Sequence, residues 1–383
     1  MKHYDLLIIG GGVLGVFHAY HALNRGLKTA LFERNPQPEG ATVRNFGQVV
    51  PSGMNVKWQE TGRKSLDIYK ALQAKHDIGV RSFGSIYIAS DEEELTLAEE
   101  LHAINKAQDY PSELLTPAAC MAKYPNLRSD YCKGGLFFPE EISVNPRVMI
   151  HRVLAHLLAD PNFDYFPGTL IRALEEVGPA CLATDNSGRQ YRGEQTFVCS
   201  GVEFEWLYPE LFRESDLETV KLQMLNLKPQ RAVQLPGNIL TGLSIRRYES
   251  FSECPSWSAI KAREATDSFW KQWGIHILFK QEADGSIILG DSHEYASVGE
   301  GARSDFYVRE EISRYFIEAG QAIFQLEHWN IDQQWLGYYS QSKTKDIFRH
   351  TLGGKIHLVT GIGGKGMTAS PGYAADNLSE LFD

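Results

Sequence analysis

The chain has 383 residues and a formal net charge of −10 at pH 7. This length exceeds what one compact core usually organises, so we expect two domains. Hydrophobic residues make up 43% of the chain and charged residues 22%, a balance that excludes wholesale disorder. The acidic net charge argues against nucleic acid or an anionic membrane as the main partner, and a small molecule is the expected one.

The targeting and redox signals of the sequence favour a cytoplasmic protein. The first expected strand begins too close to Met1 for a signal peptide, and no run of 18 apolar residues predicts a membrane span. The cysteines are scattered without zinc-type or redox-type spacing, so we expect reduced, mostly structural thiols and no metal site. They are Cys120, Cys132, Cys181, Cys199 and Cys254.

The first part of the chain predicts a β-α-β unit. Residues 4–9 (YDLLII) form an apolar run that ends in glycine, which is typical of a strand buried in a parallel sheet. Residues 13–24 have apolar side chains at helical spacing, and residues 27–34 (LKTALFER) predict a second strand. An amphipathic helix is expected over residues 56–76.

The pattern changes near residue 82, where a second domain is expected to begin. Residues 81–90 predict a strand, and residues 91–107 predict a solvated helix with an acidic first turn. A helix is expected again at 145–160, and a buried strand at 196–201 (TFVCSG). The cofactor domain is expected to resume with these two elements.

The last third of the chain predicts short strands followed by an aromatic-rich helix. The strands are expected at 275–279 and 285–292, and the helix at 305–324. Residues 354–382 then predict a strand, a glycine-rich turn and a helix that begins near Thr368.

A glycine motif follows the first strand. Gly10, Gly12 and Gly15 match G-x-G-x-x-G, in which the glycines allow a tight turn, a close approach of pyrophosphate and helix–strand packing. Glu33, at the end of the second strand, can accept hydrogen bonds from a ribose and would repel the 2′-phosphate of NADP. The motif alone leaves NAD and FAD open, and a chance glycine triplet or a solvated Glu33 is the alternative.

A second glycine-rich turn near the C-terminus favours a flavin. Residues 361–371 (GIGGKGMTASP) lie between an expected strand and an expected helix. NAD needs no second cradle, whereas backbone N–H groups at a helix N-terminus can stabilise the negative charge of a reduced flavin. A plain glycine-rich turn is the alternative.

Together these motifs resemble the FAD-dependent amine oxidoreductases, the group of glycine oxidase, monomeric sarcosine oxidase and D-amino acid oxidase. The resemblance implies an α/β fold, with a Rossmann-like FAD-binding domain and a second, mixed-sheet α+β substrate domain. The segments that carry it are the fingerprint with Ala19, the Glu33 strand end, ATVRNFG (41–47), VCSG (198–201), WLG (335–337) and the turn at 361–371.

The resemblance also divides the chain. Residues 1–82, 145–225 and 335–383 are expected to form the FAD-binding domain. Residues 83–144 and 226–334 are expected to form the substrate domain.

The resemblance implies that FAD is the cofactor. We expect it to be noncovalent, because no cysteine follows the WLG segment. The RNFG part of residues 41–47 is expected to run beside the isoalloxazine ring, with a simple turn as the alternative. The expected cofactor-binding residues are Gly10, Gly12, Gly15, Glu33, Arg34, Thr42, Arg44, Asn45, Gly47, Ser200, Gly201, Gly363, Gly364, Lys365, Gly366, Met367 and Thr368.

The activity that the resemblance implies is oxidation of a C–N bond in a small primary or secondary amine. In this group a hydride passes from the carbon next to nitrogen to the flavin, and the imine is hydrolysed in water. Oxygen or another acceptor then reoxidises the cofactor. A neutral amine is needed, so the protein must favour loss of the ammonium proton and hold the acidic end of the substrate.

Two departures from the group narrow the substrate. Many relatives carry a carboxylate-binding arginine or a flavin-linked cysteine after the WLG segment, where this chain has Tyr338, Tyr339 and Ser340. Lys365 stands where relatives often carry histidine. The segment VRNFGQVVPSG (43–53) and the missing carboxylate arginine resemble a branch associated with aminophosphonate breakdown, with an aldehyde such as phosphonoacetaldehyde as product. Arg44 and Lys365 are then the candidates to hold a phosphonate.

The candidate catalytic residues are Lys365, Arg44, Tyr339 and His276. Each has a structural alternative: a solvated loop lysine, a turn arginine, a packing aromatic and a satisfied core histidine. His276 and Lys280 are expected on a strand that leads to the substrate in relatives. The rival functions are a glycine, sarcosine or D-amino acid oxidase, a flavoprotein subunit without turnover and an NAD dehydrogenase.

Overall fold

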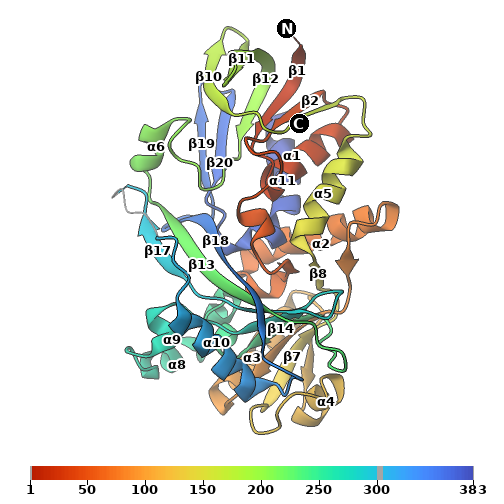
Figure 1. Ribbon diagram of the computed structural model, residues 1–383, viewed down its shortest axis with the longest axis vertical. Coiled ribbons are helices and arrows are strands. Elements are labelled where there is room, and N and C mark those ends of the chain that lie inside the picture. Colours follow the sequence, from red (N-terminus) through yellow and green to blue (C-terminus); the bar gives the residue numbers. More distant parts are fainter. Residues whose placement is uncertain (1, 300–304, 383) are drawn as a thin grey trace.

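The computed structural model describes residues 2–299 and 305–382, which form two sheet-centred halves joined by long strands (Figure 1). The first half contains an eight-stranded sheet in which six strands follow the order β10-β11-β12-β1-β2-β9. The other two strands branch from β12, because β20 pairs with β12 and β19 pairs with β20. Its strands are β1 His3–Ile9, β2 Thr29–Phe32, β9 Phe163–Phe166, β10 Ile171–Val177, β11 Ala180–Asp185, β12 Gln190–Val198, β19 Phe348–Leu352 and β20 Ile356–Thr360.

The parallel part of this sheet aligns the segments that carry the glycine motif and Glu33. β1 lies between β12 and β2, and the register pairs Ile9 with both Val198 and Phe32. The carboxyl ends of these three strands therefore meet at one edge, where ligands bind in open α/β sheets.

The second half is built on a nine-stranded mixed sheet with the path β17-β13-β16-β15-β14-β5-β7-β6, and β18 pairs with β13. These strands are β5 Ser85–Ala89, β6 Glu113–Leu115, β7 Gly134–Phe138, β13 Leu217–Leu227, β14 Asn238–Thr241, β15 Leu278–Gln281, β16 Ile287–Gly290, β17 Glu294–Ser297 and β18 Ile331–Ser342. A small third sheet contains β3 Gln48–Val49, β4 Val80–Arg81 and β8 Ile142–Val144. The expected α/β fold with a second, mixed-sheet half is confirmed.

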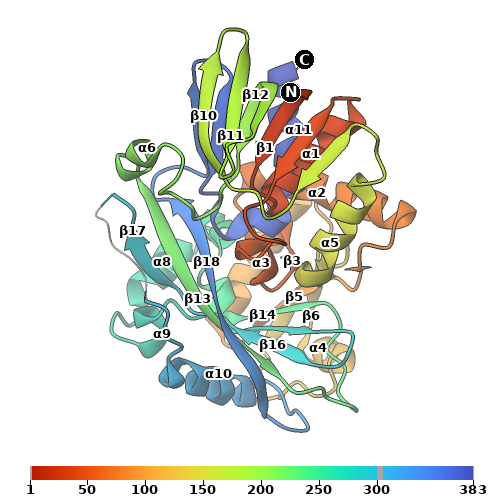
Figure 2. The same ribbon diagram turned by 45° about the horizontal axis from the view of Figure 1, so that its top comes forward.

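Helices cover the first sheet and the outer face of the second (Figure 2). Those of the first half are α1 Val13–Asn24, α2 Val56–Lys75, α5 Pro146–Leu157 and α11 Gly366–Phe382, with α11 packed against both α1 and α2. Those of the second half are α3 Glu92–Ala107, α4 Pro117–Lys123, α7 Gly242–Ile245, α8 Trp257–Arg263, α9 Phe269–Gln272 and α10 Glu310–Ile323, and α6 Pro209–Arg213 precedes β13. Short 3₁₀ turns are η1 Ala41–Val43, η2 Pro51–Gly53, η3 Glu249–Glu253 and η4 Gly363–Lys365.

The helices differ in whether a side chain caps their N-terminal N–H groups. The Asn55 and Asp91 side chains accept hydrogen bonds from backbone N–H groups of α2 and α3, which satisfies donors that a helix start leaves free. By contrast, Gly12 caps α1 without a side-chain hydrogen bond. The first turn of α1 therefore presents its N–H groups to the edge of the sheet.

Several sequence expectations need correction. α11 begins at Gly366 rather than near Thr368, because the glycine-rich turn passes directly into the helix through η4. His276 precedes β15 instead of lying on the strand, since the strand pairing starts at Leu278. All five cysteines are buried and free, as expected of structural thiols.

Two long strands link the halves and bear on the expected domain boundaries. β13 and β18 run side by side through both views and pair over almost their whole length, from Leu217↔Ser342 to Leu227↔Ile331. Both belong to the nine-stranded sheet, and the expected boundaries at 225/226 and 334/335 fall inside them. The division into two domains stays a proposal. Within the described residues, no helix combines the length and apolar character needed to cross a membrane.

Candidate functional site

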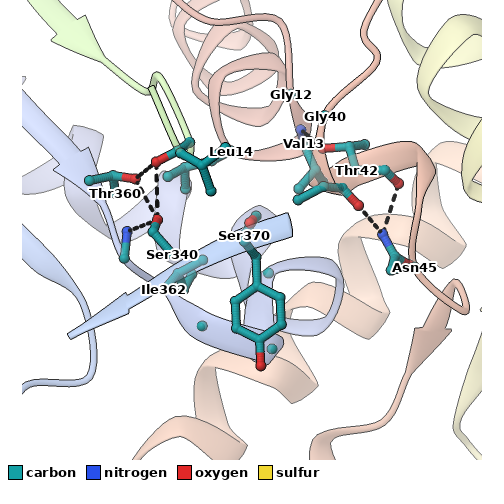
Figure 3. A pocket seen from close by; sticks show the side chains of 18 of the residues that line it. Gly12, Val13, Leu14, Gly40, Thr42, Asn45, Ser340, Thr360, Ile362 and Ser370 are labelled. Carbon is teal, nitrogen blue, oxygen red and sulfur yellow. Dashed lines mark hydrogen bonds between the residues drawn. The ribbon is translucent and has the colours of Figure 1, made fainter. Parts of the chain in front are cut away.

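A cavity of about 940 Å³ lies where the carboxyl ends of the parallel strands meet β13 and β18 (Figure 3). It is lined by sixteen of the seventeen expected cofactor residues, all except Gly15, and by all four candidate catalytic residues. Gly15 lies behind the cavity wall, where an added Cβ would come within 2.0 Å of the Gly10 carbonyl oxygen. This contact is the close helix–strand approach expected for the third glycine of the motif.

The motif end of the cavity combines helix N–H groups with one carboxylate. Gly10 has a φ of +111°, and a Cβ there would lie 2.2 Å from the Cys199 carbonyl oxygen, so only glycine fits. The buried Glu33 side chain accepts hydrogen bonds from the backbone N–H of Gly11 at 2.9 Å and of Asn35 at 3.0 Å. Its carboxylate is thereby held at the cavity wall, within reach of a ribose.

The loop at residues 41–47 forms part of the cavity wall and is held there by hydrogen bonds. Thr42 Oγ1 accepts the backbone N–H of Val13 at 2.8 Å, and Asn45 Nδ2 donates to the carbonyl oxygens of Ala41 and Thr42 (Figure 3). Gly47 has a φ of +72°, and a Cβ there would meet the Val144 carbonyl oxygen at 2.1 Å. The segment is therefore both a turn and a cavity wall, so the two sequence interpretations are compatible.

The cation of this loop is partly engaged by the protein itself. Arg44 donates from Nε to the Glu39 carbonyl oxygen at 2.7 Å and from a terminal nitrogen to the Leu336 carbonyl oxygen at 3.4 Å. Arg34, which follows Glu33, forms an ion pair with Glu203. Both arginines line the cavity but have protein partners for their charge or N–H groups.

The C-terminal turn is held by a small hydroxyl network. Thr360 Oγ1 donates to the Gly201 carbonyl oxygen at 2.7 Å, and Ser340 Oγ accepts the backbone N–H of Gly361 at 3.1 Å (Figure 3). This network ties β18, β20 and the VCSG loop together. The first turn of α11, with Gly366, Met367 and Thr368, then presents helix N–H groups to the cavity.

The donor set fits FAD. Helix N–H groups at Gly12 suit a pyrophosphate, the Glu33 carboxylate suits a ribose, and the start of α11 suits the anionic edge of a flavin. Two further polar atoms that line the cavity, Gln48 Nε2 and Ser370 Oγ, are buried and have no hydrogen-bond partner in the described parts of the chain. Buried polar groups normally have partners, so these two atoms are available to hydrogen-bond a ligand in the cavity.

The other end of the cavity gathers ionisable groups from three segments. His276 Nε2 lies 2.6 Å from Asp291 Oδ1, and His293 Nδ1 hydrogen-bonds to the Gly274 carbonyl oxygen at 2.9 Å. Burial opposes ionisation of Asp291, but its interactions with His276, His293 and Arg247 outweigh burial and lower its pKa below the usual value. The carboxylate is therefore ionised at neutral pH.

The neighbours of this pair stay in defined protonation states. Burial, followed by the positive charge of Arg247, lowers the pKa of His293 to about 3, so its imidazole is neutral. Burial also raises the pKa of Tyr339 well above its usual value, so its hydroxyl keeps its proton and can donate. Lys365 Nζ lies 3.1 Å from Glu249 Oε1 and about 6 Å from the centre of the Trp58 ring.

The ligand atoms of His276, Asp291 and His293 all lie within 4.8 Å of one another, a spacing that a metal ion could bridge. However, the Gly274 carbonyl already engages His293 Nδ1, and Arg247 contributes a positive charge to the same group. The expectation of no metal stays a prediction.

Sequence reasoning selected His276 but missed Arg247, Asp291 and His293. Arg247 follows the short helix α7, and the other two follow the buried strand β16, so pairing of distant strands brings them to one cavity. The available signal was GDSH directly after an apolar strand, since charged residues at the end of a buried strand often mark a site. Lys280 has a different role, because its buried Nζ donates to the Phe46 and Val144 carbonyl oxygens, each at 2.6 Å.

Comparison with known families now decides the cofactor. The sequence profile of the DAO family, described as FAD dependent oxidoreductase, matches residues 5–381. The chain belongs to this family. It is therefore an FAD-dependent oxidoreductase, and the NAD alternative is set aside.

Curated relatives are distant. Mitochondrial sarcosine dehydrogenase of Mus musculus is 28% identical over 146 residues, which cover 37% of this chain and 16% of that protein. Glycine oxidase of Bacillus licheniformis is 25% identical over 245 residues, which cover 59% of this chain and 62% of that protein. The matched part of the chain thus spans about a sixth of the first relative and less than two thirds of the second.

Solved structures establish the same fold. Glycine oxidase from Geobacillus kaustophilus superposes with a TM-score of 0.76 at 15% identity, over 100% of this chain and 95% of that one. FAD-bound L-alpha-glycerophosphate oxidase from Mycoplasma pneumoniae superposes with a TM-score of 0.78 at 15% identity, again over 100% and 95%. These identities support the fold, and the substrate must be argued from the site.

Proposed function

We propose that the protein oxidises the C–N bond of a small primary or secondary amine that also carries an acidic group, with an aminophosphonate as the preferred substrate. The observation that carries this proposal is the make-up of the cavity beyond the expected flavin position. There, the ionised Asp291 carboxylate and its neighbour His276 lie beside cationic and phenolic side chains, so one region can bind an ammonium group and the neighbouring region an anion.

Some relatives are named for substrates with an amine, and others for substrates with a phosphate group, so their names agree with the two functional groups of the proposed substrate. Glycine oxidase, sarcosine dehydrogenase and iminodiacetate oxidase are named for amines, and they match this chain in sequence or in fold. Aerobic glycerol-3-phosphate dehydrogenases of Staphylococcus match it at 27% identity over 164 residues, and the glycerophosphate oxidase shares its fold. Members of this fold are thus named for amines and for substrates with a phosphorus oxyanion.

The chemistry divides between cofactor and protein. When bound, FAD accepts the electron pair that leaves the substrate carbon. The protein orients the amine and removes its ammonium proton, for which the Asp291 carboxylate and the His276 imidazole provide a place at the cavity wall. Tyr339 donates a hydrogen bond from its hydroxyl, and Arg44 and Lys365 add positive charge near the loop and turn expected to flank the flavin.

A glycine, sarcosine or D-amino acid oxidase is the second candidate, because the relatives named above include such enzymes. A carboxylate and a phosphonate use the same cations, so the cavity accommodates either in principle. The two differ in charge and in the number of oxygens that the site must satisfy.

The test is the substrate preference of the holoenzyme. Rates of anaerobic flavin reduction should be measured with 2-aminoethylphosphonate, its N-methyl form, glycine, sarcosine and an uncharged amine of similar size. The proposal predicts the highest kcat/KM for one of the phosphonates. Preference for glycine or sarcosine over both phosphonates would leave amine oxidation standing and remove the aminophosphonate assignment.

A further inference from the structure

Arg247 lines the cavity, and within residues 2–299 and 305–382 no carboxylate forms an ion pair with it. Its neighbour in sequence, Arg246, differs sharply, because it forms ion pairs with Asp91, Glu93 and Glu94 on the α3 side and with Glu264. The two adjacent arginines that follow α7 therefore lie in different surroundings. Arg246 ties the substrate half together, and Arg247 lines the cavity.

The partners of Arg247 leave most of its donors available. One terminal nitrogen donates to the Tyr295 hydroxyl at 2.9 Å, which is the single hydrogen bond from this guanidinium among the residues that the structure describes. Within the same residues, no carboxylate oxygen lies within 4.0 Å of it. A guanidinium has five N–H donors, so several remain for a ligand.

The side chain is nevertheless a persistent cation in a largely enclosed place. Burial works against its charge, but Tyr295, Tyr339 and Asp291 together outweigh burial and raise its pKa. Asp291 is not its close partner, since among the described residues it pairs at 2.6 Å with His276 Nε2 and no Asp291 oxygen lies within 4.0 Å of the Arg247 guanidinium. Charges that lose part of their contact with water are normally paired, so we expect an anion beside the partly buried Arg247.

The other cations of the cavity are better satisfied. Lys365 lies 3.1 Å from the Glu249 carboxylate, and Arg44 donates to two backbone carbonyl oxygens. Arg247 also lines a second hollow of about 430 Å³, together with His293 and Tyr295. Among the cations named here, it has the fewest protein oxygens around it.

We propose that Arg247 is the principal anchor of the acidic group of the substrate. The inference rests on the proposed function for the amine end, and it adds a residue that determines which acids bind. The planar guanidinium suits two oxygens of a phosphonate or carboxylate at once. The protonated Tyr339 hydroxyl lies in the same cavity as a further donor, while Asp291 and His276 are left for the amine.

The test separates anion binding from turnover by using ligands that have no amine. Methylphosphonate and acetate are titrated into the oxidised holoenzyme, and binding is followed by calorimetry and by the change in the visible flavin spectrum. Arg247→Gln removes the charge, and Arg247→Lys keeps it without the planar fork. Arg314→Gln is the matched control, because it removes one exposed arginine of α10 that forms an ion pair with Glu310 and lies outside the cavity lining.

We expect methylphosphonate to bind the wild type and the Arg314→Gln variant equally. Arg247→Gln should weaken binding about 10- to 100-fold, which is the loss of one charge-assisted interaction. Arg247→Lys should weaken it less. If Arg247→Gln fails to retain FAD, the comparison of Arg247→Lys with the wild type decides, since loss of bidentate geometry alone should still weaken the phosphonate severalfold.

The outcomes distinguish this inference from the proposed function. The proposed role of Arg247 is refuted if the wild type and both Arg247 variants bind the anion equally. It is also refuted if the wild type binds no anion. If the anchor behaves as expected but no aminophosphonate reduces the flavin, the inference stands and the proposed function fails. Tighter binding of acetate than of methylphosphonate supports the anchor and assigns it to a carboxylic acid.

Discussion

Replacing Glu33 with Gln should loosen FAD without touching the reacting end of the cavity. Both carboxylate oxygens are in use, because Oε2 accepts the Gly11 N–H and Oε1 accepts the Asn35 N–H. A glutamine has only one acceptor oxygen, so its NH₂ group faces one of these buried N–H donors. An unsatisfied buried donor costs about 1 to 3 kcal/mol, which sets the expected loss in the free energy of unfolding of the apoprotein.

The effect on the cofactor adds to this loss. A charge-assisted hydrogen bond from a ribose hydroxyl contributes about 1.5 to 3 kcal/mol, so the dissociation constant of FAD should rise about 10- to 100-fold. Fluorescence titration of apoprotein with FAD measures this constant, and thermal unfolding measures the stability. Glu194→Gln is the control, since Glu194 is an exposed acid of β12 outside the cavity. Unchanged FAD affinity in Glu33→Gln would refute the ribose role.

Three further predictions concern the cofactor, the turn and pH. Acid precipitation should release all yellow colour into the supernatant, and colour that stays in the pellet would contradict noncovalent binding. Lys365→Met should lower kcat/KM about 10- to 100-fold for an anionic amine and little for an uncharged one, whereas an equal loss for every amine would assign Lys365 to the reduced flavin instead. Burial lowers the pKa of His18 from 6.5 to about 4, and its Nδ1 bonds to the Leu14 carbonyl. The unfolded chain therefore binds this proton at a higher pH than the folded protein, so the stability due to this group is lost as pH falls from about 6.5 to about 4. His18→Gln should flatten the pH dependence of the unfolding free energy by about 3 kcal/mol over that window, and an unchanged slope would count against a buried neutral imidazole.

The parts of the site that could be predicted from sequence are those marked by a motif within one short segment. Gly10, Gly12 and Glu33 lie within one β-α-β unit, and the hydrogen bond that the Gly11 N–H donates to Glu33 is local to that unit. The C-terminal turn was predicted from its glycines and the RNFG loop from the family resemblance, and the structure places both at the same cavity. Long elements such as α2 and α3 were also located within a few residues, because apolar periodicity and N-caps mark their bounds.

The missed parts depend on pairings between distant strands. Arg247 precedes a short 3₁₀ turn, and Asp291 follows a four-residue strand, so neither segment has enough periodicity to indicate where its side chains lie. Their meeting depends on β15, which pairs with β14 on one side and with β16 on the other. The expected domain boundaries at 225/226 and 334/335 fell within β13 and β18 for a similar reason. An alternating strand pattern does not reveal which sheet the strand joins.

The most direct test of the account is the visible spectrum of the purified protein before and after anaerobic addition of 2-aminoethylphosphonate and its N-methyl form, with glycine, sarcosine and a neutral amine alongside. The account predicts a flavin spectrum at the start and bleaching that is fastest with a phosphonate amine. A flavin spectrum that none of these amines bleaches would contradict amine oxidation and favour a flavoprotein subunit without turnover.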